Sequence, residues 1–393
     1  MHRKDIHLTS ITGMGNTHFR PSTPHCGRFG DAANMLQRTI MSLLLSLSVL
    51  ASHAVAAERP VNLAPWNFKC THESVHIHQP SAEVDQVFQY GRYRQLNSDR
   101  SSYNQDKAQV QAFTEIARYL RLAAAHDHPQ AGWLLNDLLY QQIDTDYDNT
   151  ATPSRMSREA EVDQIIQRLV ADSNPYGYLL IAGHARQAWD MQKALDNYRK
   201  AAELGSPQAQ YNIADWLDGR SIMSHVVNVS SPETKGLAIA LYQCAAEQGH
   251  GESSYELGNK LLRQNKIKEA LPMLQKAAMH GSASAASTLM DIFSGQRYTI
   301  RQFLKKPSKN DPERVQRYEQ IRVFLIEKQK EDIVLKDIDQ IVPLPPASLP
   351  PWNGSFAWSK VHQAAPTKPS EALMTRLSRE KGLDARTGLP VNK

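Results

Sequence analysis

The stretch KALDNYRKAAELGSPQAQYNIADWLDG, from Lys193 to Gly219, decides the fold because it contains one complete helix-turn-helix unit. Its apolar residues fall three and four positions apart, which predicts two helices that each bury one stripe. Gly205 stands where the first helix must end in a left-handed turn, and Ser206 and Pro207 suit the start of the second. The predicted stripes are Ala194, Leu195, Tyr198, Ala201 and Ala202, and then Ala209, Ile213, Trp216 and Leu217.

Copies of this unit recur along the chain. Their turn residues are Asp127, Ser173, Gly205, Gly249 and Gly281, so the intervals are 46, 32, 44 and 32 residues. A period near 32 residues predicts a solenoid, because one such unit cannot bury its own apolar face without stacking on its neighbours. We expect a distorted second copy, since serine tolerates the left-handed conformation less well than aspartate or glycine. A non-repetitive bundle of alanine-rich helices is the alternative.

The repeated pattern A-A-E-x-G-x-x-x-A-x-x-x-L/I-G/A is most nearly intact around Gly205 and Gly249. It resembles the Sel-like repeats, which are relatives of tetratricopeptide repeats. The resemblance covers about half of the chain. It implies an all-α, right-handed α-solenoid of helix-turn-helix repeats that binds other proteins on its faces.

The N-terminal part reads as an export signal. Residues 1–34 are polar and aperiodic, and we expect them to be a non-native or disordered extension ahead of Met35. Residues 35–57 contain the basic Arg38, an apolar run and a small-residue site, which predicts a signal peptide cleaved after Ala56 or Ala57. A retained anchor is the alternative. With the resemblance to bacterial repeat families, the expected location is the periplasm, with no integral membrane segment after cleavage.

The charge balance argues against a nucleic-acid partner. The whole chain has 45 Lys and Arg against 40 Asp and Glu, but residues 1–57 hold five of the former and two of the latter. The mature chain would therefore carry 40 basic and 38 acidic side chains. No basic run interleaved with aromatic residues appears in it.

Residues 58–115 are predicted to cap the solenoid of residues 116–300, with Val84, Val87, Phe88 and Gly91 on one helix face. The cap contains His72-Glu73-Ser74-Val75-His76, which matches the H-E-x-x-H pattern of zinc metalloproteases. That chemistry needs a stable helix, and the β-branched residues and proline nearby disfavour one. A looser zinc site of Cys70, His72, His76 and His78 is the alternative. We expect no enzyme activity, no cofactor and no bound zinc.

Two inserted segments interrupt the repeats. The first, residues 141–157, carries Asp144, Asp146 and Asp148 but lacks the glycine and glutamate of a calcium-binding EF-hand loop. A solvated acidic loop is one interpretation. The other is a partner-binding loop, because insertions between solenoid helices emerge on one face. The second insertion, residues 220–232, is polar.

The C-terminal third changes composition. Residues 301–360 are predicted to form a cap helix, with Val315, Tyr318, Ile321 and Leu325 in its stripe, followed by a proline-rich strap. The strap, IVPLPPASLPPWNG at residues 341–354, favours extended backbone anchored by Trp352. A proline-rich ligand for another domain is the alternative. Residues 361–393 are predicted to be a flexible tail.

Cys70 and Cys244 are the cysteines that remain after signal cleavage, and an oxidising periplasm would favour a disulfide between them. Cys244 occupies the slot of Lys200 and Lys276 in neighbouring repeats, so we expect it to face solvent. Two unpaired thiols, too far apart to meet, are the alternative.

The combination of this solenoid with FKCTHE (residues 68–73), VFQYGRY (residues 87–93) and LPPASLPPWNG (residues 344–354) resembles a group of exported bacterial proteins. That group includes immunity proteins against phospholipase effectors of type VI secretion systems. The resemblance implies a protein partner, a secreted phospholipase effector. It defines no catalytic residues. A general periplasmic adaptor or envelope-assembly scaffold is the alternative.

Overall fold

The computed structural model describes residues 63, 66–98, 107–145, 153–220, 224, 227, 231–295, 311–362 and 364–391. The predicted extension and signal peptide lie outside these residues. Residues Arg59–Lys393 form one compact unit. The regular secondary structure of its described part is helical, and isolated bridge residues such as the pair Leu383 and Pro390 form no named strand there, which confirms the all-α prediction. Among the described helices, none combines the length and the apolarity that crossing a bilayer requires.

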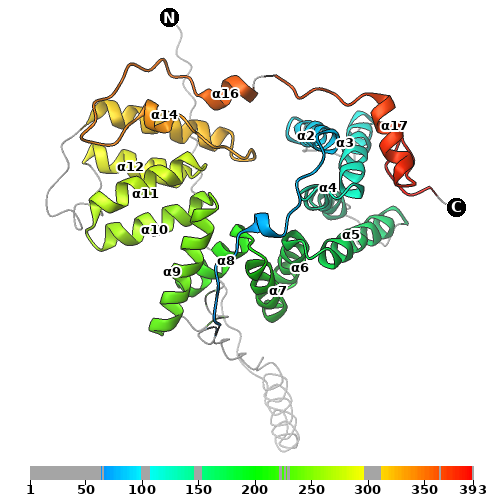
Figure 1. Ribbon diagram of the computed structural model, residues 1–393, viewed down its shortest axis with the longest axis horizontal. Helices are drawn as coiled ribbons and strands as arrows, with labels where there is room; N and C mark the ends of the chain where they lie inside the picture. The colour runs from blue at the N-terminus through cyan, green and yellow to red at the C-terminus, as the bar shows by residue number, and fades with distance from the viewer. Residues whose placement is uncertain are drawn as a thin grey trace, which may run out of the picture. The chain divides into compact units, whose positions relative to one another are not determined.

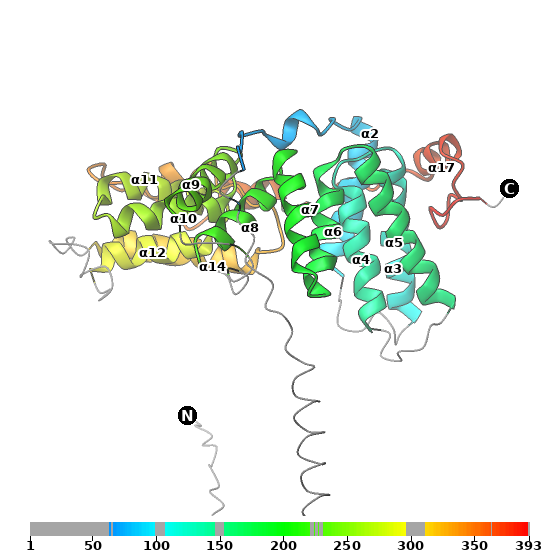
Figure 2. The same ribbon diagram turned by 90° about the horizontal axis from the view of Figure 1, so that it is seen from below.

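Helix pairs that correspond to the predicted repeats follow one another along the chain. Each helix from α2 through α12 packs against the next one in sequence, which is the arrangement of an α-solenoid (Figures 1 and 2). The pairs are α3 (Lys107–Ala125) with α4 (Ala131–Thr145), α5 (Pro153–Ala171) with α6 (Pro175–Gln187), α7 (Met191–Glu203) with α8 (Pro207–Leu217), α9 (Pro232–Glu247) with α10 (Gly251–Arg263), and α11 (Ile267–Met279) with α12 (Ala283–Ser294).

The turn inside each pair contains one residue in the left-handed conformation, at the positions that the sequence predicts. The φ angles are 61° at Asp127, 53° at Ser173, 91° at Gly205, 87° at Gly249 and 90° at Gly281. The expected distortion at the second copy is absent from its turn. There the Asn174 side chain caps α6 by accepting the Tyr176 N–H at 3.0 Å, so the helix starts normally.

Both stripes of the 193–219 unit are buried, as predicted. Alanines dominate the contact, and Ala194, Ala201 and Ala202 are completely buried, so neighbouring helices can approach closely. Buried apolar residues along the described part of the solenoid gather in three clusters, centred on α2–α5, on α6–α9 and on α10–α14. Stability is therefore distributed along the array rather than concentrated in one core.

The first cluster includes the N-terminal helix α2 (Ala82–Leu96). Its predicted face is buried against α3, where an added Cβ at Gly91 would lie 2.8 Å from the Tyr119 Cβ. Only glycine permits this approach. Because α3 begins at Lys107, the expected boundary between cap and solenoid at residue 115 falls inside a helix.

The proline-rich strap is held by buried arginines of α14 (Pro312–Glu327). Arg314 donates to the carbonyl of Pro343 at 3.1 Å, and Arg317 donates to that of Pro350 at 2.7 Å. A proline-rich segment offers carbonyls without matching N–H groups, so guanidinium groups are suitable partners. Trp352 is partly buried and packs against the apolar cluster centred on α10–α14. The short helices α15 (Ile338–Ile341) and α16 (Ala357–His362) flank the strap.

The predicted flexible tail is wrong for residues 364–391. They contain helix α17 (Glu371–Glu380), which packs on α3 and buries Met374 and Leu377 completely or nearly so. Arg118 on α3 pairs with Glu371 at 2.6 Å. The abundance of Lys, Arg, Ser and Pro suggested disorder, but the Ser370 cap and the apolar pair three residues apart specify a helix.

Candidate functional site

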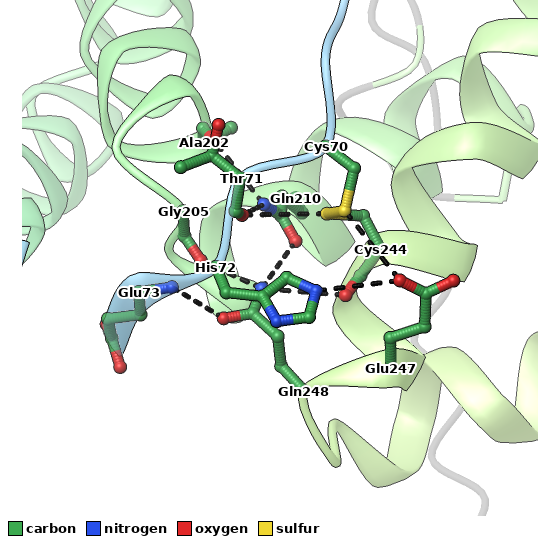
Figure 3. Close-up of a disulfide and its surroundings, with 10 residues drawn as sticks. All are labelled: Cys70, Thr71, His72, Glu73, Ala202, Gly205, Gln210, Cys244, Glu247 and Gln248. Carbon is green, nitrogen blue, oxygen red and sulfur yellow. Dashed lines mark hydrogen bonds and ion pairs between the residues drawn. A yellow bond between two sulfur atoms is a disulfide. The ribbon is translucent and has the colours of Figure 1, made fainter. Parts of the chain in front are cut away.

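Residues 66–80, called here the anchored segment, cross the third and fourth repeats. Cys70 of this segment forms a disulfide with Cys244 of α9, with Cα atoms 5.5 Å apart and a sequence separation of 174 (Figure 3). Trp66 and Phe68 pack against the cluster of α6–α9. The segment is therefore fastened both covalently and by apolar contacts.

Two glutamines fix the backbone of the anchored segment beside this disulfide. The Gln248 side-chain oxygen Oε1 accepts the Glu73 N–H at 2.7 Å, and its side-chain nitrogen Nε2 donates to the Gly205 carbonyl at 2.9 Å. Gln210, which is fully buried, donates to the Thr71 carbonyl at 3.1 Å (Figure 3). Backbone groups that would otherwise be unpaired are thus satisfied by side chains of α8 and of the residue that follows α9.

The expectation that Cys244 faces solvent is wrong, because Cys244 is only 1 % exposed. At the equivalent position, neighbouring repeats have the lysines Lys200 and Lys276, which are at least partly exposed to solvent. Here the anchored segment lies over Cys244, and the Thr71 carbonyl is 3.6 Å from the Cys244 sulfur. Pattern reasoning on the repeats alone could not include a covering segment from another part of the chain.

The H-E-x-x-H motif does not adopt the geometry of a metalloprotease. Its helical part is one turn of 3-10 helix, η1 (Glu73–Val75), and His72 lies outside it in extended conformation. The His72 Nε2 is 3.5 Å from a Glu247 carboxylate oxygen, whereas His76 lines a separate groove. The two histidines therefore do not share a helical face.

Glu73 is the unusual titratable group of the anchored segment. Burial raises its pKa to about 7, because the charged carboxylate loses hydration. Its carboxylate also raises the pKa of the nearby Tyr176 hydroxyl, an effect secondary to the burial of that phenol. Such a carboxyl group changes charge near neutral pH.

An open groove of about 1120 Å³ runs along α5. Its walls come from the anchored segment at His76 and His78, from α3 and α4, and from the turn at residues 383–390. It therefore combines surfaces from the first two repeats with the anchored segment and the turn that follows α17. No sequence signal identified it, because its walls come from four regions that are distant in sequence.

The groove has fixed charges of both signs. Arg121 makes a bidentate ion pair with Glu161, at 2.6 and 2.8 Å, and also donates to the Thr387 carbonyl at 3.0 Å. Arg168 pairs with Asp127 at the α3–α4 turn. Bidentate pairs hold their side chains in defined positions, so the groove offers a preformed pattern of charge.

His128 also lines this groove, but it is not a candidate ligand. Its ring stacks on Phe88 with centroids 3.7 Å apart, and its residue is 5 % exposed. Burial lowers its pKa to about 4, although Asp85 acts in the opposite direction. A neutral, stacked imidazole is a packing residue.

Trp189 is the functional candidate that the sequence did not reveal. It is 72 % exposed and has a φ of 61° in the turn between α6 and α7. The corresponding turns after α8, α10 and α12 use Gly219, Asn265 and Gly295, which tolerate positive φ. A bulky residue in this conformation is strained, and strain concentrates where function retains it.

Of the predicted partner-binding aspartates, Asp144 belongs to the last turn of α4, while Asp146 and Asp148 lie outside the described residues. The connection that carries them leads directly into α5, the helix along which the groove runs. The insertion is therefore adjacent in sequence to a groove wall.

Comparison with known proteins gives one family match and several structural likenesses. The family model of a domain of unknown function, DUF6396, matches residues 285–391, less than a third of the chain. No curated protein matches the chain significantly. The matched region comprises α12, α14 and the elements that follow them.

Three solved structures are similar to this chain. The immunity protein PA5088 from Pseudomonas aeruginosa has a TM-score of 0.49 and 19 % identity, covering 71 % of this chain and 95 % of that one. The immunity protein Pa5087 from the same organism has a TM-score of 0.47 and 20 % identity, with coverage of 71 % and 95 %. A Sel1 repeat protein from Oxalobacter formigenes has a TM-score of 0.39 and 18 % identity, with coverage of 62 % and 98 %. At these identities, function has to be argued from this chain's own residues.

Proposed function

We propose that this repeat protein is exported to the periplasm, where it binds and neutralises a phospholipase effector of a type VI secretion system. It acts without catalysis, by occupying the surface through which the effector reaches its lipid substrate. The observation that carries the proposal is the open groove on an α-solenoid whose sequence resembles immunity proteins of this kind.

The motifs that carry the resemblance build the scaffold. In FKCTHE, Cys70 forms the disulfide; in VFQYGRY, Phe88 is fully buried; in LPPASLPPWNG, the Pro350 carbonyl accepts from Arg317. None of the groove-lining residues belongs to these motifs. Partner choice therefore falls to the groove and to Trp189, while the motifs maintain the shape that presents them.

The physical demands of neutralisation fit this surface. An immunity protein must hold its target longer than membrane damage takes, which calls for about nanomolar affinity and an interface above about 1,200 Å². Exposed tryptophans are favoured anchors in such interfaces. The insertion with Asp144, Asp146 and Asp148 would add carboxylates facing the cationic, phosphate-binding mouth of a phospholipase, and opposite charge accelerates encounter.

The decisive experiment co-expresses the mature protein in the periplasm with a candidate phospholipase effector chosen from its gene neighbourhood. Growth rescue and co-purification are the expected results. If the unmodified protein neither rescues growth nor captures the effector, the immunity function is wrong, and the general adaptor becomes the better hypothesis. Replacing the three aspartates by alanine tests the insertion separately: equal protection would remove it from the mechanism and leave the groove.

A matched pair of substitutions on α5 tests the groove itself. Gln164 lines it, whereas Gln167, one helical turn later, does not, and both side chains are exposed. Gln164→Trp should fill the groove and weaken effector binding at least about tenfold, which corresponds to about 1.4 kcal/mol. Gln167→Trp should leave binding unchanged. Equal affinities for the two variants would place the interface elsewhere.

A further inference from the structure

Four metal-binding side chains meet at the point where the anchored segment crosses α9. Cys70 and His72 are alternate residues of the segment, and Cys244 and Glu247 are three positions apart on the helix. Side chains at these spacings point to one side of an extended chain and to one face of a helix. The segment thus contributes a sulfur and an imidazole, and the helix contributes a sulfur and a carboxylate.

The donor atoms are close enough to share one ion. The ligand atoms of Cys70, His72 and Cys244 all lie within 4.8 Å of one another. Glu247 has a carboxylate oxygen 3.5 Å from the His72 Nε2 and 3.9 Å from the Cys70 sulfur (Figure 3). In a tetrahedral zinc site, bond lengths of about 2.0–2.3 Å put neighbouring donors roughly 3.3–3.8 Å apart.

We propose that Cys70, His72, Cys244 and Glu247 form a zinc site when the disulfide is reduced. The two sulfur atoms that form the disulfide are also two of the proposed zinc ligands. The chain can therefore hold either the disulfide or the zinc ion, but not both. A dithiol supplies two electrons and two protons: the Cys70–Cys244 bond breaks, two thiols form, and the dithiol becomes a disulfide. Zn²⁺ then binds the two sulfurs as thiolates and releases their two protons to solvent.

The site keeps its architecture without the disulfide because other bonds hold the segment. The Glu73 N–H bonds to Gln248, the Thr71 carbonyl accepts from Gln210, and Trp66 packs in the core. These contacts keep Cys70 and His72 over α9 after reduction. The side chains of His72 and Glu247 are 44 % and 62 % exposed, so an ion can enter from solvent.

The chemistry of the four ligands also indicates which metal the site would bind and whether that metal would be structural or catalytic. Two thiolates with an imidazole favour zinc over magnesium or calcium, which prefer oxygen ligands. Four protein ligands close the coordination sphere, so the ion would stabilise the segment and would not activate water. The set differs from the zinc site considered from the sequence, because His76 and His78 line the groove instead.

The test uses the full mature chain in two states, oxidised and reduced with a phosphine that is removed under anaerobic conditions. Native mass spectrometry should find one zinc per reduced chain and none per oxidised chain, and reoxidation should release the ion. Cobalt in place of zinc should give the thiolate-to-metal charge-transfer absorption of a two-sulfur, tetrahedral site. A chromophoric chelator measures affinity by competition.

Single substitutions distinguish the proposed zinc ligands from a nearby histidine that is not a ligand. His72→Ala and Glu247→Ala, both at exposed positions, should each weaken zinc binding at least about tenfold, while His76→Ala should not change it. The proposal is overturned if the reduced chain holds no zinc, or if neither His72→Ala nor Glu247→Ala alters the affinity. Should reduction unfold the segment, hydrogen exchange must show that zinc restores it; failure to do so also overturns the proposal.

Discussion

Gly205 lies directly under the backbone of His72. A Cβ added to this glycine would come within 2.4 Å of the His72 carbonyl carbon and 2.5 Å of the Glu73 nitrogen. The turn of the third repeat thus also supports the backbone of the anchored segment. Its glycine satisfies two requirements, a φ of 91° and a lack of space above it.

This double requirement predicts unequal costs for one substitution at two equivalent turns. Gly281 has nearly the same φ, but an added Cβ there would meet only the Ile333 carbonyl at 3.6 Å. Gly281→Ala should lower the free energy of unfolding by about 1–2 kcal/mol through backbone strain alone. Gly205→Ala should cost at least about 1 kcal/mol more and reduce hydrogen-exchange protection of the Glu73 amide. Equal denaturant midpoints for the two variants would contradict the close contact.

Trp189 should lower the stability of the fold and strengthen binding of the effector. Trp189→Asn places there the residue type that the equivalent α10–α11 turn uses at Asn265. Relief of the left-handed strain should raise the free energy of unfolding by about 0.5–1 kcal/mol, and loss of the exposed ring should weaken effector binding. Thermal unfolding and binding titration measure the two effects. Asn265→Ala is the control that should lower stability and leave binding intact.

Glu73 should make stability depend on pH. Its folded pKa, about 7, lies above the ordinary value of 4.5, so the folded protein binds the extra proton. Its favourable contribution is complete below pH 4.5 and is lost as pH rises toward 7. Glu73→Gln should therefore become the more stable protein as pH rises through this window, by on the order of 1–2 kcal/mol. Urea unfolding of both proteins at pH 5 and pH 8 provides the comparison; a constant difference would refute the raised pKa.

Helix α17 should contribute to global stability. Met374→Ala and Leu377→Ala remove side chains that are completely or almost completely buried against the first repeat. Each should lower the free energy of unfolding by about 2–4 kcal/mol. Leu389→Ala is the control, because that leucine is 40 % exposed. If all three variants melt alike, the helix is not part of the cooperative unit.

The solenoid could be predicted because its signal is local and repeated. A turn residue such as Gly205, a cap such as Ser206 and a stripe such as Ala194 to Ala202 lie within one 27-residue stretch and recur. The burial of Cys244 and the groove could not be predicted this way, because they depend on which distant segment covers which repeat. Trp189 left no pattern, since an unfavourable residue at a turn opposes the local rules that prediction uses.

Helix α17 affects the order in which parts of the protein unfold. A stack of repeats ordinarily loses its terminal units first, because each end has a neighbour on one side only. Here Glu371 and Arg118, 253 residues apart in sequence, join the last helix to the first repeat, while Cys70 ties the N-terminal segment to the fourth. Within the described residues, neither the anchored segment nor α17 is left to fray independently, so a protease or an unfolding force acting on either must first break contacts made by the opposite half of the chain.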